Sequence, residues 1–315
     1  MSHPCHVRVE FCQPPADLAR YFTTFYVAEI TVPEDGPGDG TVSDYLHPEW
    51  GNLRLLSCNA VRAISETDGR RDSIVDDTNF IATGPSARAV RFTVRTTRLW
   101  GIGFLPLGWA KFVRMPAGEL ANAVLDGNTH PAMASFAPLV DGLFDTQPDQ
   151  ARELAWITAC FRARMAEPVI DEARILSIHA ALVDPDVVTV AELVERSGVS
   201  PRTVERVCFR DFGFPPKLLM RRQRFMRSLS QFMLDPSLKW IGAIDSQYHD
   251  QAQFVRDFRQ FMGMTPRQYA GMAHPVLDVF VRERMRLAGS AVQALDGPRG
   301  TMIAPPSTGF AGRSL

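Results

Sequence analysis

The chain has 315 residues, of which 45% are hydrophobic and 22% charged, and its formal net charge is −1. This composition is typical of a globular protein long enough for two domains with separate cores. No run approaches the roughly 18 consecutive apolar residues of a membrane span. The first twenty residues lack the basic start and apolar run of a signal peptide. We therefore expect a cytoplasmic protein with no membrane partner.

The cysteines are single and widely spaced: Cys5, Cys12, Cys58, Cys160 and Cys208. Their number is odd and none belongs to a C-x-x-C pair, which argues against a disulfide framework and against a zinc ribbon. We expect reduced thiols, most of them buried.

The first 115 residues are predicted to be rich in β-strands. Apolar and polar residues alternate, as in half-buried strands, at 6–12, 90–95 and 100–104. Segments with turn chemistry separate such runs at 33–40, 68–69 and 84–85. Several short strands at this spacing predict a small antiparallel barrel or sandwich.

From Pro116 onward the pattern becomes helical. Pro148 is placed to begin a helix that ends before Pro168, and its apolar face suits either packing on the strands or a contact with a second copy. Residues 171–273 are helical in pattern throughout. One further short helix is predicted at 277–287, and the Gly-, Pro- and Ser-rich stretch 289–315 is predicted to be a mobile tail.

Positive charge is concentrated near the C-terminus. Residues 200–270 contain twelve basic and six acidic side chains, a net charge of +6, so the rest of the chain is acidic. A basic region in a near-neutral protein is expected of a nucleic-acid-binding module attached to another domain, although a solvated helical surface can have the same composition.

A helix-turn-helix is predicted within this region. Thr189 and Glu192 have the spacing of a capping box, and the helix they begin ends at Gly198, which tolerates a positive φ. Ser200 can then cap a second helix with Pro201 in its first position. In a helix-turn-helix the second helix enters the major groove of DNA, so the helix that begins at Pro201 is the predicted recognition helix.

A long helix and a second unit follow. The helix ends at Asp235-Pro236, and about 19 residues give a rod of nearly 30 Å, close to the roughly 34 Å of one DNA turn. The second unit comprises a helix at 238–246 and a recognition helix capped by Asp250, in which Phe254 and Phe258 face the core.

These residues resemble the AraC/XylS family of transcription regulators over roughly residues 175–272. The resemblance is carried by Tyr248-x-Asp250-Gln251-Ala252-x-Phe254-x-Arg256-x-Phe258 and by Gly263-x-Thr265-Pro266-x-x-Tyr269. It implies a DNA-binding domain at 171–273 whose two recognition helices enter adjacent major grooves of one asymmetric site. The sequence departs from the family pattern in the second turn: Gln247 stands where a turn glycine is common in the family. A glycine, Gly242, occurs instead inside the preceding predicted helix. The base contacts of the second unit are therefore less certain than those of the first.

The resemblance assigns base-reading roles to Arg202, Glu205 and Arg206 in the first unit and to Gln251, Val255 and Arg256 in the second. Arginine can bind guanine in a bidentate manner, whereas Glu205 can either accept from cytosine or orient a neighbouring arginine. The predicted phosphate contacts are Ser200, Arg210, Lys217, Arg222, Arg224 and Arg267. For the arginines and lysines of the long helix, solvated surface is the alternative.

Many members of this family carry an N-terminal cupin-like sensor, and the resemblance implies one here. The predicted fold is therefore α+β, with a small antiparallel, cupin-like β-barrel and flanking helices at 1–170, the double helix-turn-helix at 171–273, and a short helix and tail at 274–315. The barrel aromatics Trp50, Phe80, Phe92, Trp100, Phe104 and Trp109 suit either a pocket for an apolar effector or an ordinary core, and the core is favoured.

Catalytic motifs are missing from the sequence. His47 stands beside Glu49 without the further histidines of a metal-dependent cupin, and neither a G-x-S-x-G elbow, a phosphate-binding glycine loop nor HExxH occurs. We predict a non-enzymatic transcription factor with no cofactor or metal. Its expected partner is promoter DNA, and RNA polymerase, a small-molecule effector and a second copy are candidate partners. The alternatives are a DNA-repair methyl acceptor, which needs a zinc-held cysteine cluster, and a cupin-type enzyme fused to a DNA module.

Overall fold

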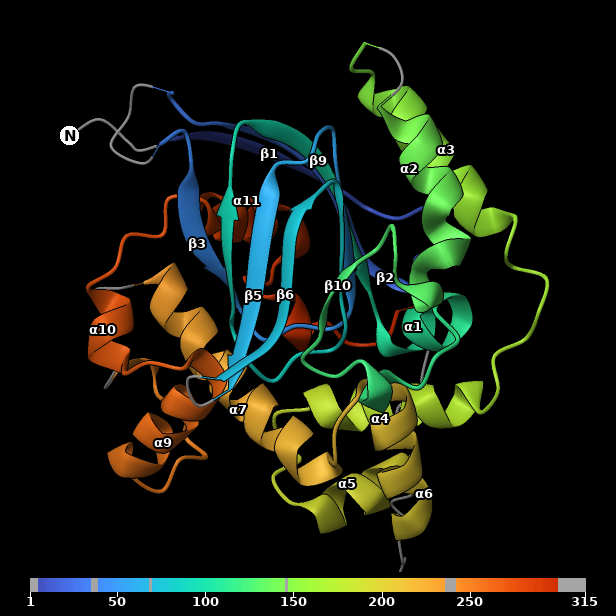
Figure 1. Cartoon of the computed structure of the whole chain (residues 1–315). Helices are drawn as coiled ribbons and strands as arrows, with labels where there is room; N and C mark the ends of the chain where they lie inside the picture. Colours follow the sequence, from blue (N-terminus) through green and yellow to red (C-terminus); the bar gives the residue numbers. More distant parts are fainter. Residues whose placement is uncertain (1–4, 35–38, 68–69, 145–146, 236–241, 300–315) are drawn as a thin grey trace, which may run out of the picture.

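Two antiparallel sheets form the N-terminal half of the computed structural model, which describes residues 5–34, 39–67, 70–144, 147–235 and 242–299 (Figure 1). The six-stranded sheet has the order β1 (His6–Cys12), β2 (Phe22–Thr31), β9 (Thr97–Phe104), β4 (Asn52–Leu56), β7 (Phe80–Thr83) and β10 (Val124–Asp126). The four-stranded sheet has the order β3 (Val42–Leu46), β8 (Val90–Val94), β5 (Val61–Thr67) and β6 (Arg70–Thr78). The antiparallel β-domain is thus confirmed. A closed barrel is not, because no strand pairing between described residues joins the two sheets.

The alternation of side chains along β2 separates two cores. Phe25 and Val27 point to the helices, whereas Tyr26, Ala28 and Ile30 point to the four-stranded sheet. The strand is buried over most of its length because both of its faces are covered. One core therefore lies between the sheets, and the other lies between the six-stranded sheet and the helices.

The predicted turn at Asp68-Gly69 lies outside the described residues, as do residues 35–38 of the predicted 33–40 loop. Of the six aromatic residues considered for a pocket, five are buried in the core that faces the helices, namely Trp50, Phe80, Trp100, Phe104 and Trp109. Phe92 is the exception, because it lies between the sheets and lines a cavity there.

Helices α1 (Pro106–Phe112), α2 (Ala137–Leu143) and α3 (Gln150–Arg162) follow the strands. Helix α3 begins after Asp149, which accepts a hydrogen bond from the Arg152 amide. Its buried Glu153 accepts hydrogen bonds from both terminal nitrogens of Arg98, each at 2.6 Å, and from Trp100 Nε1 at 2.7 Å. Helix α3 thus packs on the strands, while a contact with a second copy stays a prediction.

The C-terminal half consists of α4 (Glu172–Val183), α5 (Val190–Ser197), α6 (Pro201–Val207), α7 (Pro216–Leu234), α9 (Gln251–Met262), α10 (Pro266–Ala270) and α11 (Leu277–Ala288). In Figure 1 α7 runs between α5 and α6 at one end and α9 and α10 at the other. The core that faces the helices continues from the six-stranded sheet into this half, where it includes Val204, Phe225 and Phe258. None of the described helices is long and apolar enough to cross a membrane.

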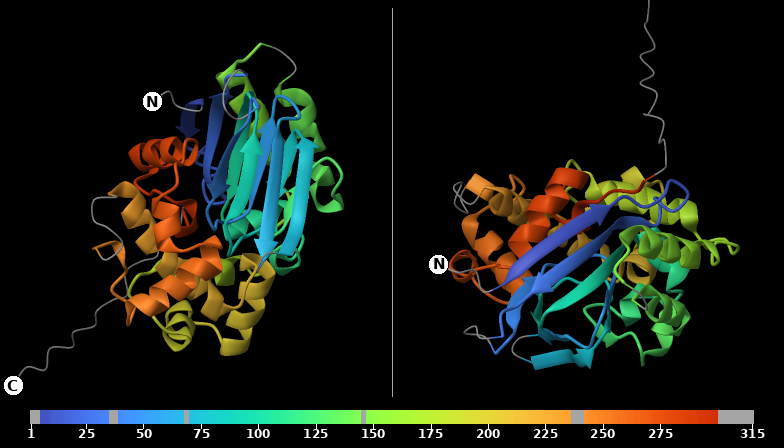
Figure 2. Two further views of the ribbon diagram at one scale, coloured as in Figure 1. Left: turned by 60° about the vertical axis from the view of Figure 1, so that its left-hand side comes forward. Right: turned by 90° about the horizontal axis from the view of Figure 1, so that it is seen from above.

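The stretch after α11 departs from the prediction of a mobile tail. Ala291, Val292, Ala294 and Asp296 are buried, and a short 3₁₀ turn forms at Gln293–Leu295. Figure 2 shows that this end of the chain returns to the β-domain, with α11 lying along β1. The small apolar side chains of Ala291, Val292 and Ala294 belong to the buried core. A Gly-, Pro- and Ser-rich composition therefore did not predict the structure of this stretch. Residues 300–315 of the predicted tail lie outside the described residues.

Candidate nucleic-acid interface

The first helix-turn-helix unit is built by local capping, as predicted. The Glu192 amide donates to Thr189 Oγ1 at 3.2 Å, and the Thr189 amide donates to Glu192 Oε2 at 2.9 Å. Gly198 ends α5 with a φ of 69°, which is left-handed backbone that favours glycine. Ser200 then caps α6 by accepting from the Thr203 amide.

The recognition helix α6 buries its apolar side and exposes its polar side. Val204 and Val207 are completely buried, whereas Arg202, Glu205 and Arg206 are exposed. The three base-reading candidates of the first unit therefore lie together on the free face of one helix.

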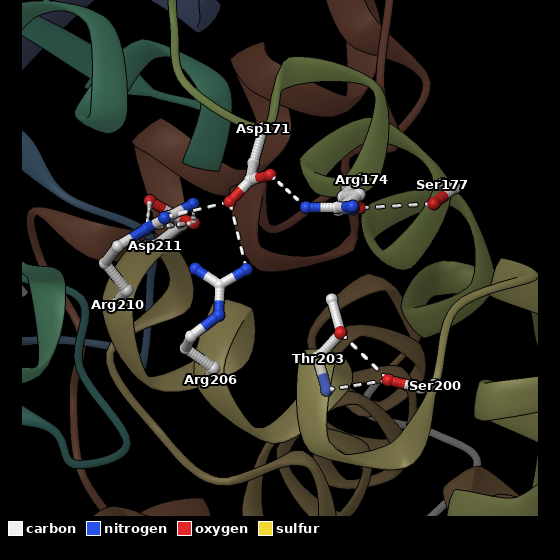
Figure 3. Close-up of polar contacts among 8 residues, drawn as sticks. All are labelled: Asp171, Arg174, Ser177, Ser200, Thr203, Arg206, Arg210 and Asp211. Carbon is white, nitrogen blue, oxygen red and sulfur yellow. Dashed lines mark hydrogen bonds and ion pairs between the residues drawn. The ribbon is translucent and has the colours of Figure 1, made fainter.

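A carboxylate outside α6 holds one of these arginines. Asp171, which precedes α4, accepts from Arg206 Nη2 at 3.1 Å and from Arg210 Nη1 at 3.0 Å (Figure 3). Its other oxygen accepts from Arg174 at 2.5 Å. Burial alone would raise the pKa of Asp171, but the hydrogen bonds from Arg210, Arg206 and Arg174 outweigh it and lower that pKa. Arg206 is thus oriented by Asp171 and not by Glu205.

The second recognition helix, α9, starts at the predicted cap. Asp250 accepts from the Gln253 amide at 2.6 Å, and Phe254 and Phe258 are buried. Gln251 and Arg256 are exposed and Val255 is half-buried, so these candidates also lie on the free side of their helix. Residues 238–241 of the helix predicted at 238–246 lie outside the described residues; Gly242 and Ala243 are helical, whereas residues 244–246 are not.

Gln247 explains how the second turn forms without a glycine. Its φ is not positive, so the turn does not need left-handed backbone at this position. Its amide donates to Asp245 Oδ1 at 2.9 Å, and its side chain accepts from Arg227 Nη2 at 2.8 Å. The departure from the family pattern is therefore a different turn that is held by hydrogen bonds.

Helix α9 is fixed to α7 by a buried carboxylate. Asp257 accepts from Arg221 Nη2 at 2.5 Å, from Arg224 Nη2 at 3.0 Å and from the Tyr248 hydroxyl at 3.1 Å. The Arg224 guanidinium also lies 4.3 Å from the centre of the Tyr248 ring. Arg224 was predicted to contact phosphate, but its guanidinium instead links α7 to Asp257 of α9 and to Tyr248.

Arg222 is also not placed to contact phosphate. Its side chain is 0% exposed, and its guanidinium lies 3.9 Å from the centre of the Trp50 ring in the β-domain. Its Nη1 donates to the carbonyl oxygens of Ser86 at 3.0 Å and of Glu49 at 3.3 Å. Burial lowers the pKa of Arg222 to about 9. The residue therefore joins the helical C-terminal half to the β-domain.

The remaining phosphate candidates divide into two groups. Lys217 and Arg267 are exposed and form no ion pair with the described residues, and Ser200 is exposed at the start of α6. Arg210 is half-buried and its guanidinium is shared between Asp211 and Asp171. Among the phosphate candidates, Lys217 and Arg267 are thus the exposed cations without an ion pair to the described residues.

Sequence reasoning missed one residue on the free side of α9. Arg259 is exposed, and it lies four residues after Val255 and eight after Gln251, which places all three on one face. That spacing is the signal that could have identified it. No ion pair involving Arg259 is formed with the part of the chain that the structure describes.

His47 connects the β-domain to the second unit. It is buried, and its Nε2 lies 2.8 Å from the Tyr269 hydroxyl of α10. Burial lowers the pKa of His47 to about 3, so the imidazole is neutral. Within the described ranges, no group of three or more His, Cys, Asp or Glu residues is arranged to hold a metal ion.

Comparison with known proteins identifies the helical half. A model of the helix-turn-helix domain family matches residues 193–272, from α5 to just beyond α10. ToxT from Vibrio cholerae O395 is similar over 85% of this chain and 98% of its own, with 11% identity and a TM-score of 0.41. ToxT bound to (E)-4-(8-methylnaphthalen-1-yl)but-3-enoic acid has the same coverage and identity and a TM-score of 0.42. The AraC-like transcriptional activator CuxR covers 71% of this chain and 87% of its own, with 16% identity and a TM-score of 0.26. A search of curated protein sequences finds no match.

Proposed function

Because its helix-turn-helix domain is that of the AraC/XylS family of transcription regulators, we propose that the chain binds specific promoter sequences and regulates transcription there. The proposed role is that of a binding protein and not of an enzyme. The observation that carries the proposal is the pair of recognition helices, α6 and α9, whose polar faces are exposed at opposite ends of α7 (Figure 1). Because α7 has 19 residues, it spans about 28 Å, close to one turn of DNA.

The proposed base-reading residues are Arg202, Glu205 and Arg206 on α6 and Gln251, Val255 and Arg256 on α9, with Arg259 added. Lys217 and Arg267 are the proposed phosphate contacts, together with the Ser200 end of α6. Exposed arginines can donate two hydrogen bonds to guanine, and exposed cations neutralise phosphates without reading sequence. Arg222 and Arg224 are left out of the DNA contacts because their guanidinium groups are engaged inside the protein.

Control of DNA binding is proposed to come from residues 1–170, through a small-molecule effector or through dimerisation. Two contacts support this proposal: Trp50 packs against Arg222 of α7, and His47 is hydrogen-bonded to Tyr269 of α10. A structural change in the β-domain would therefore act directly on the helical half. Contact with RNA polymerase is a further proposal that follows from the regulator role alone.

The experiment that tests the function is a selection of bound duplexes from a random pool by the full-length protein, repeated at two salt concentrations. We expect an asymmetric consensus with two half-sites about one helical turn apart. A pool without sequence preference, combined with a steep dependence on salt, would leave only non-specific binding and overturn the proposal.

A further inference from the structure

A cavity lies between the two sheets of the β-domain. Its volume is about 160 Å³, and its wall is largely apolar. Ile30 and Leu56 line it from the six-stranded sheet, and Ala63, Phe92 and Val94 line it from the four-stranded sheet. A cavity of about 150 Å³ lined by Leu, Ile and Phe is known to hold benzene, so this space can hold a single ring.

One wall of the cavity is formed by the part of the chain that follows the two helix-turn-helix units. We call residues 274–296 the C-terminal lid. Phe280 and Val281 of α11, together with Val292, form part of the cavity wall. The Phe280 ring lies 5.2 Å from the Tyr26 ring at 89°, an edge-to-face contact across the cavity wall. Figure 2 shows the lid against the β-domain.

One carboxylate of the β-domain anchors the beginning of the lid. Asp44 on β3 accepts from the amides of Val276 at 3.0 Å and Leu277 at 2.9 Å, and it lies 2.9 Å from His274 Nδ1. Val276 makes no side-chain cap of its own, so Asp44 satisfies amides at the start of α11. These contacts of Asp44 attach the start of the lid to the four-stranded sheet.

The other end of the lid reaches the polar end of the cavity. Gln293 Nε2 donates to Glu49 Oε2 at 2.7 Å, and Gln293 Oε1 accepts from Thr23 at 3.0 Å. Glu49 also pairs with Arg54 at 2.8 Å. Hydrogen-bonding groups of the lid and of both β2 and β4 therefore meet at one point of an otherwise apolar cavity.

The charges around the cavity compensate one another. Arg54 is paired with Glu49, and Arg284 is paired with Asp296 at 2.6 Å. His47, which also lines the cavity, is neutral because burial lowers its pKa to about 3. A charged ligand would lose its hydration without gaining an unpaired counter-ion, so the cavity favours an uncharged one.

The lid is also in contact with the helix that joins the two helix-turn-helix units. Gln223, which is buried on α7, donates from Nε2 to the carbonyl oxygen of Ala294 at 2.9 Å. Gln293 and Ala294 are neighbours, so the residue that reaches the cavity and the residue that contacts α7 are adjacent. The contact with the cavity and the contact with α7 are thus separated by a single peptide bond.

We infer that the cavity binds an uncharged, mainly apolar molecule about the size of one aromatic ring with one hydrogen-bonding group, and that the C-terminal lid passes its presence to α7. The ligand's hydrogen-bonding group faces Gln293 and Glu49. The binding step stands on the cavity alone, whereas its effect on DNA rests on the proposed function.

Three probes of one ring size test the ligand class with the full-length protein. Benzene is apolar, phenol adds a hydroxyl group, and benzoate adds a charge. In calorimetry and thermal unfolding we expect phenol and benzene to bind and to raise Tm by about 2 °C at ten times Kd, and benzoate not to bind. Benzoate binding as tightly as phenol, or no binding by any probe, would overturn the inference.

Two variants of the lid separate a specific contact from general damage. Gln293→Ala removes the hydrogen-bonding group at the cavity and is expected to weaken phenol binding about fivefold while leaving benzene binding unchanged. Leu287→Ala is the matched control, because Leu287 is exposed on α11 and does not line the cavity. An equal loss of phenol binding in both variants would contradict the assigned position of the ligand.

The effect on DNA is measured with the duplex selected by the full-length protein, with and without saturating phenol. We expect the Kd for DNA to change at least threefold in the wild type and to be unresponsive in Gln223→Ala. If DNA binding is specific but no probe binds, the inference fails and the proposed function stands. If phenol binds but DNA does not, the proposed function fails and the cavity remains. If both bind without affecting each other, the transmission through the lid is wrong.

Discussion

Arg206 carries both a proposed role in base reading and an ion pair with Asp171. The pair is half exposed, with 49% of the Arg206 side chain accessible, so it stabilises the folded protein by less than about 1 kcal/mol. A bidentate contact with guanine provides about 1–3 kcal/mol of discrimination. The contact with DNA is the larger effect, so the ion pair orients Arg206 without preventing it from reading a base.

Arg206→Ala is therefore expected to weaken binding to the selected duplex by about 1–3 kcal/mol and to relax the preference at one base pair. Competition with duplexes that differ at single positions measures both quantities. Arg196→Ala is the control, since Arg196 is an exposed, ion-paired arginine on α5 and not on a recognition helix. Unchanged affinity and unchanged preference in Arg206→Ala would remove this residue from the interface.

Two buried histidines predict how stability depends on pH. Burial lowers the pKa of His47 and of His179 to about 3, so both are neutral in the folded protein. In the unfolded chain their pKa returns to about 6.5, and the unfolded state then binds protons that the folded state does not. The free energy of unfolding therefore falls as the pH is lowered from about 6.5 towards 3.

His274 acts in the opposite direction. Burial alone would lower its pKa, but the hydrogen bond to Asp44 outweighs this and raises it. The stability that His274 contributes is complete below about pH 6.5 and is lost as the pH rises through the raised value. Between pH 5 and 6.5 the histidine contribution to the slope therefore comes mainly from His47 and His179.

In that window each of the two histidines is expected to lower the free energy of unfolding by up to about 1.4 kcal/mol per pH unit. Urea unfolding at several pH values measures the slope. His47→Gln can keep a hydrogen bond to Tyr269 but cannot titrate, so its slope should be about half that of the wild type. His249→Gln, at an exposed position on the DNA-binding half, should leave the slope unchanged. A wild-type slope near zero would contradict the assignment.

At the scale of the elements, the turn of the first unit depends on left-handed backbone. Gly198 has a φ of 69°, and a Cβ added there would meet nothing within 4 Å, so a side chain is opposed by backbone strain alone. Gly271, at the end of α10, has a φ of −89° and would give only ordinary contacts. The two positions form a matched pair.

Gly198→Ala is expected to destabilise the protein by about 1–2 kcal/mol, whereas Gly271→Ala should change stability by less than about 0.5 kcal/mol. Denaturant unfolding compares the two variants. Because α6 is positioned by this turn, Gly198→Ala should also weaken DNA binding. Equal stability of both variants would show that the turn can form without left-handed backbone.

The elements of the helical half could be predicted because their signals are local. Each capping residue acts within four residues of the helix end that it caps. The structure places all of them as predicted, namely Thr189 with Glu192, Gly198, Ser200 and Asp250. The alternation in the β-domain likewise predicted β1, β8 and β9. It could not distinguish a closed barrel from two sheets, because strand pairing is a long-range property.

The roles that could not be predicted depend on residues that are distant in the sequence. An arginine on an amphipathic helix resembles any solvated cation, and only the fold brings Arg222 to Trp50 and to a carbonyl group 173 positions away. For the same reason, small apolar residues at 291–294 resemble a tail until the β-domain provides the surface that buries them. Likewise, Arg210 and Arg224 form ion pairs with Asp171 and Asp257, two carboxylates that lie far from them in the sequence.

At the scale of the whole molecule, the β-domain and the DNA-binding half share one core. The cluster of buried side chains is continuous from Trp100 on β9 through Trp50 and Phe212 to Phe225 on α7. Backbone contact adds to it, since the Ala89 amide donates to the Phe261 carbonyl at 2.7 Å. A shared core makes separate unfolding of the two halves unfavourable, so we expect the two halves to behave as one cooperative body.

The wild type is therefore expected to unfold in one transition, and Arg222 tests how strongly the halves are joined. Arg222→Ala removes the contact with Trp50 and leaves a cavity, which should lower the free energy of unfolding by about 2–4 kcal/mol. Arg222→Met keeps most of the volume and removes a buried charge that has no ionic partner among the described residues, so it should lower the free energy of unfolding by less. Lys217→Ala, at an exposed position of the same helix, is the control. Two results would show that the halves are coupled only weakly: two separate transitions in the wild type, or an Arg222→Ala variant as stable as Lys217→Ala. A signal from the β-domain would then reach α7 only through the lid.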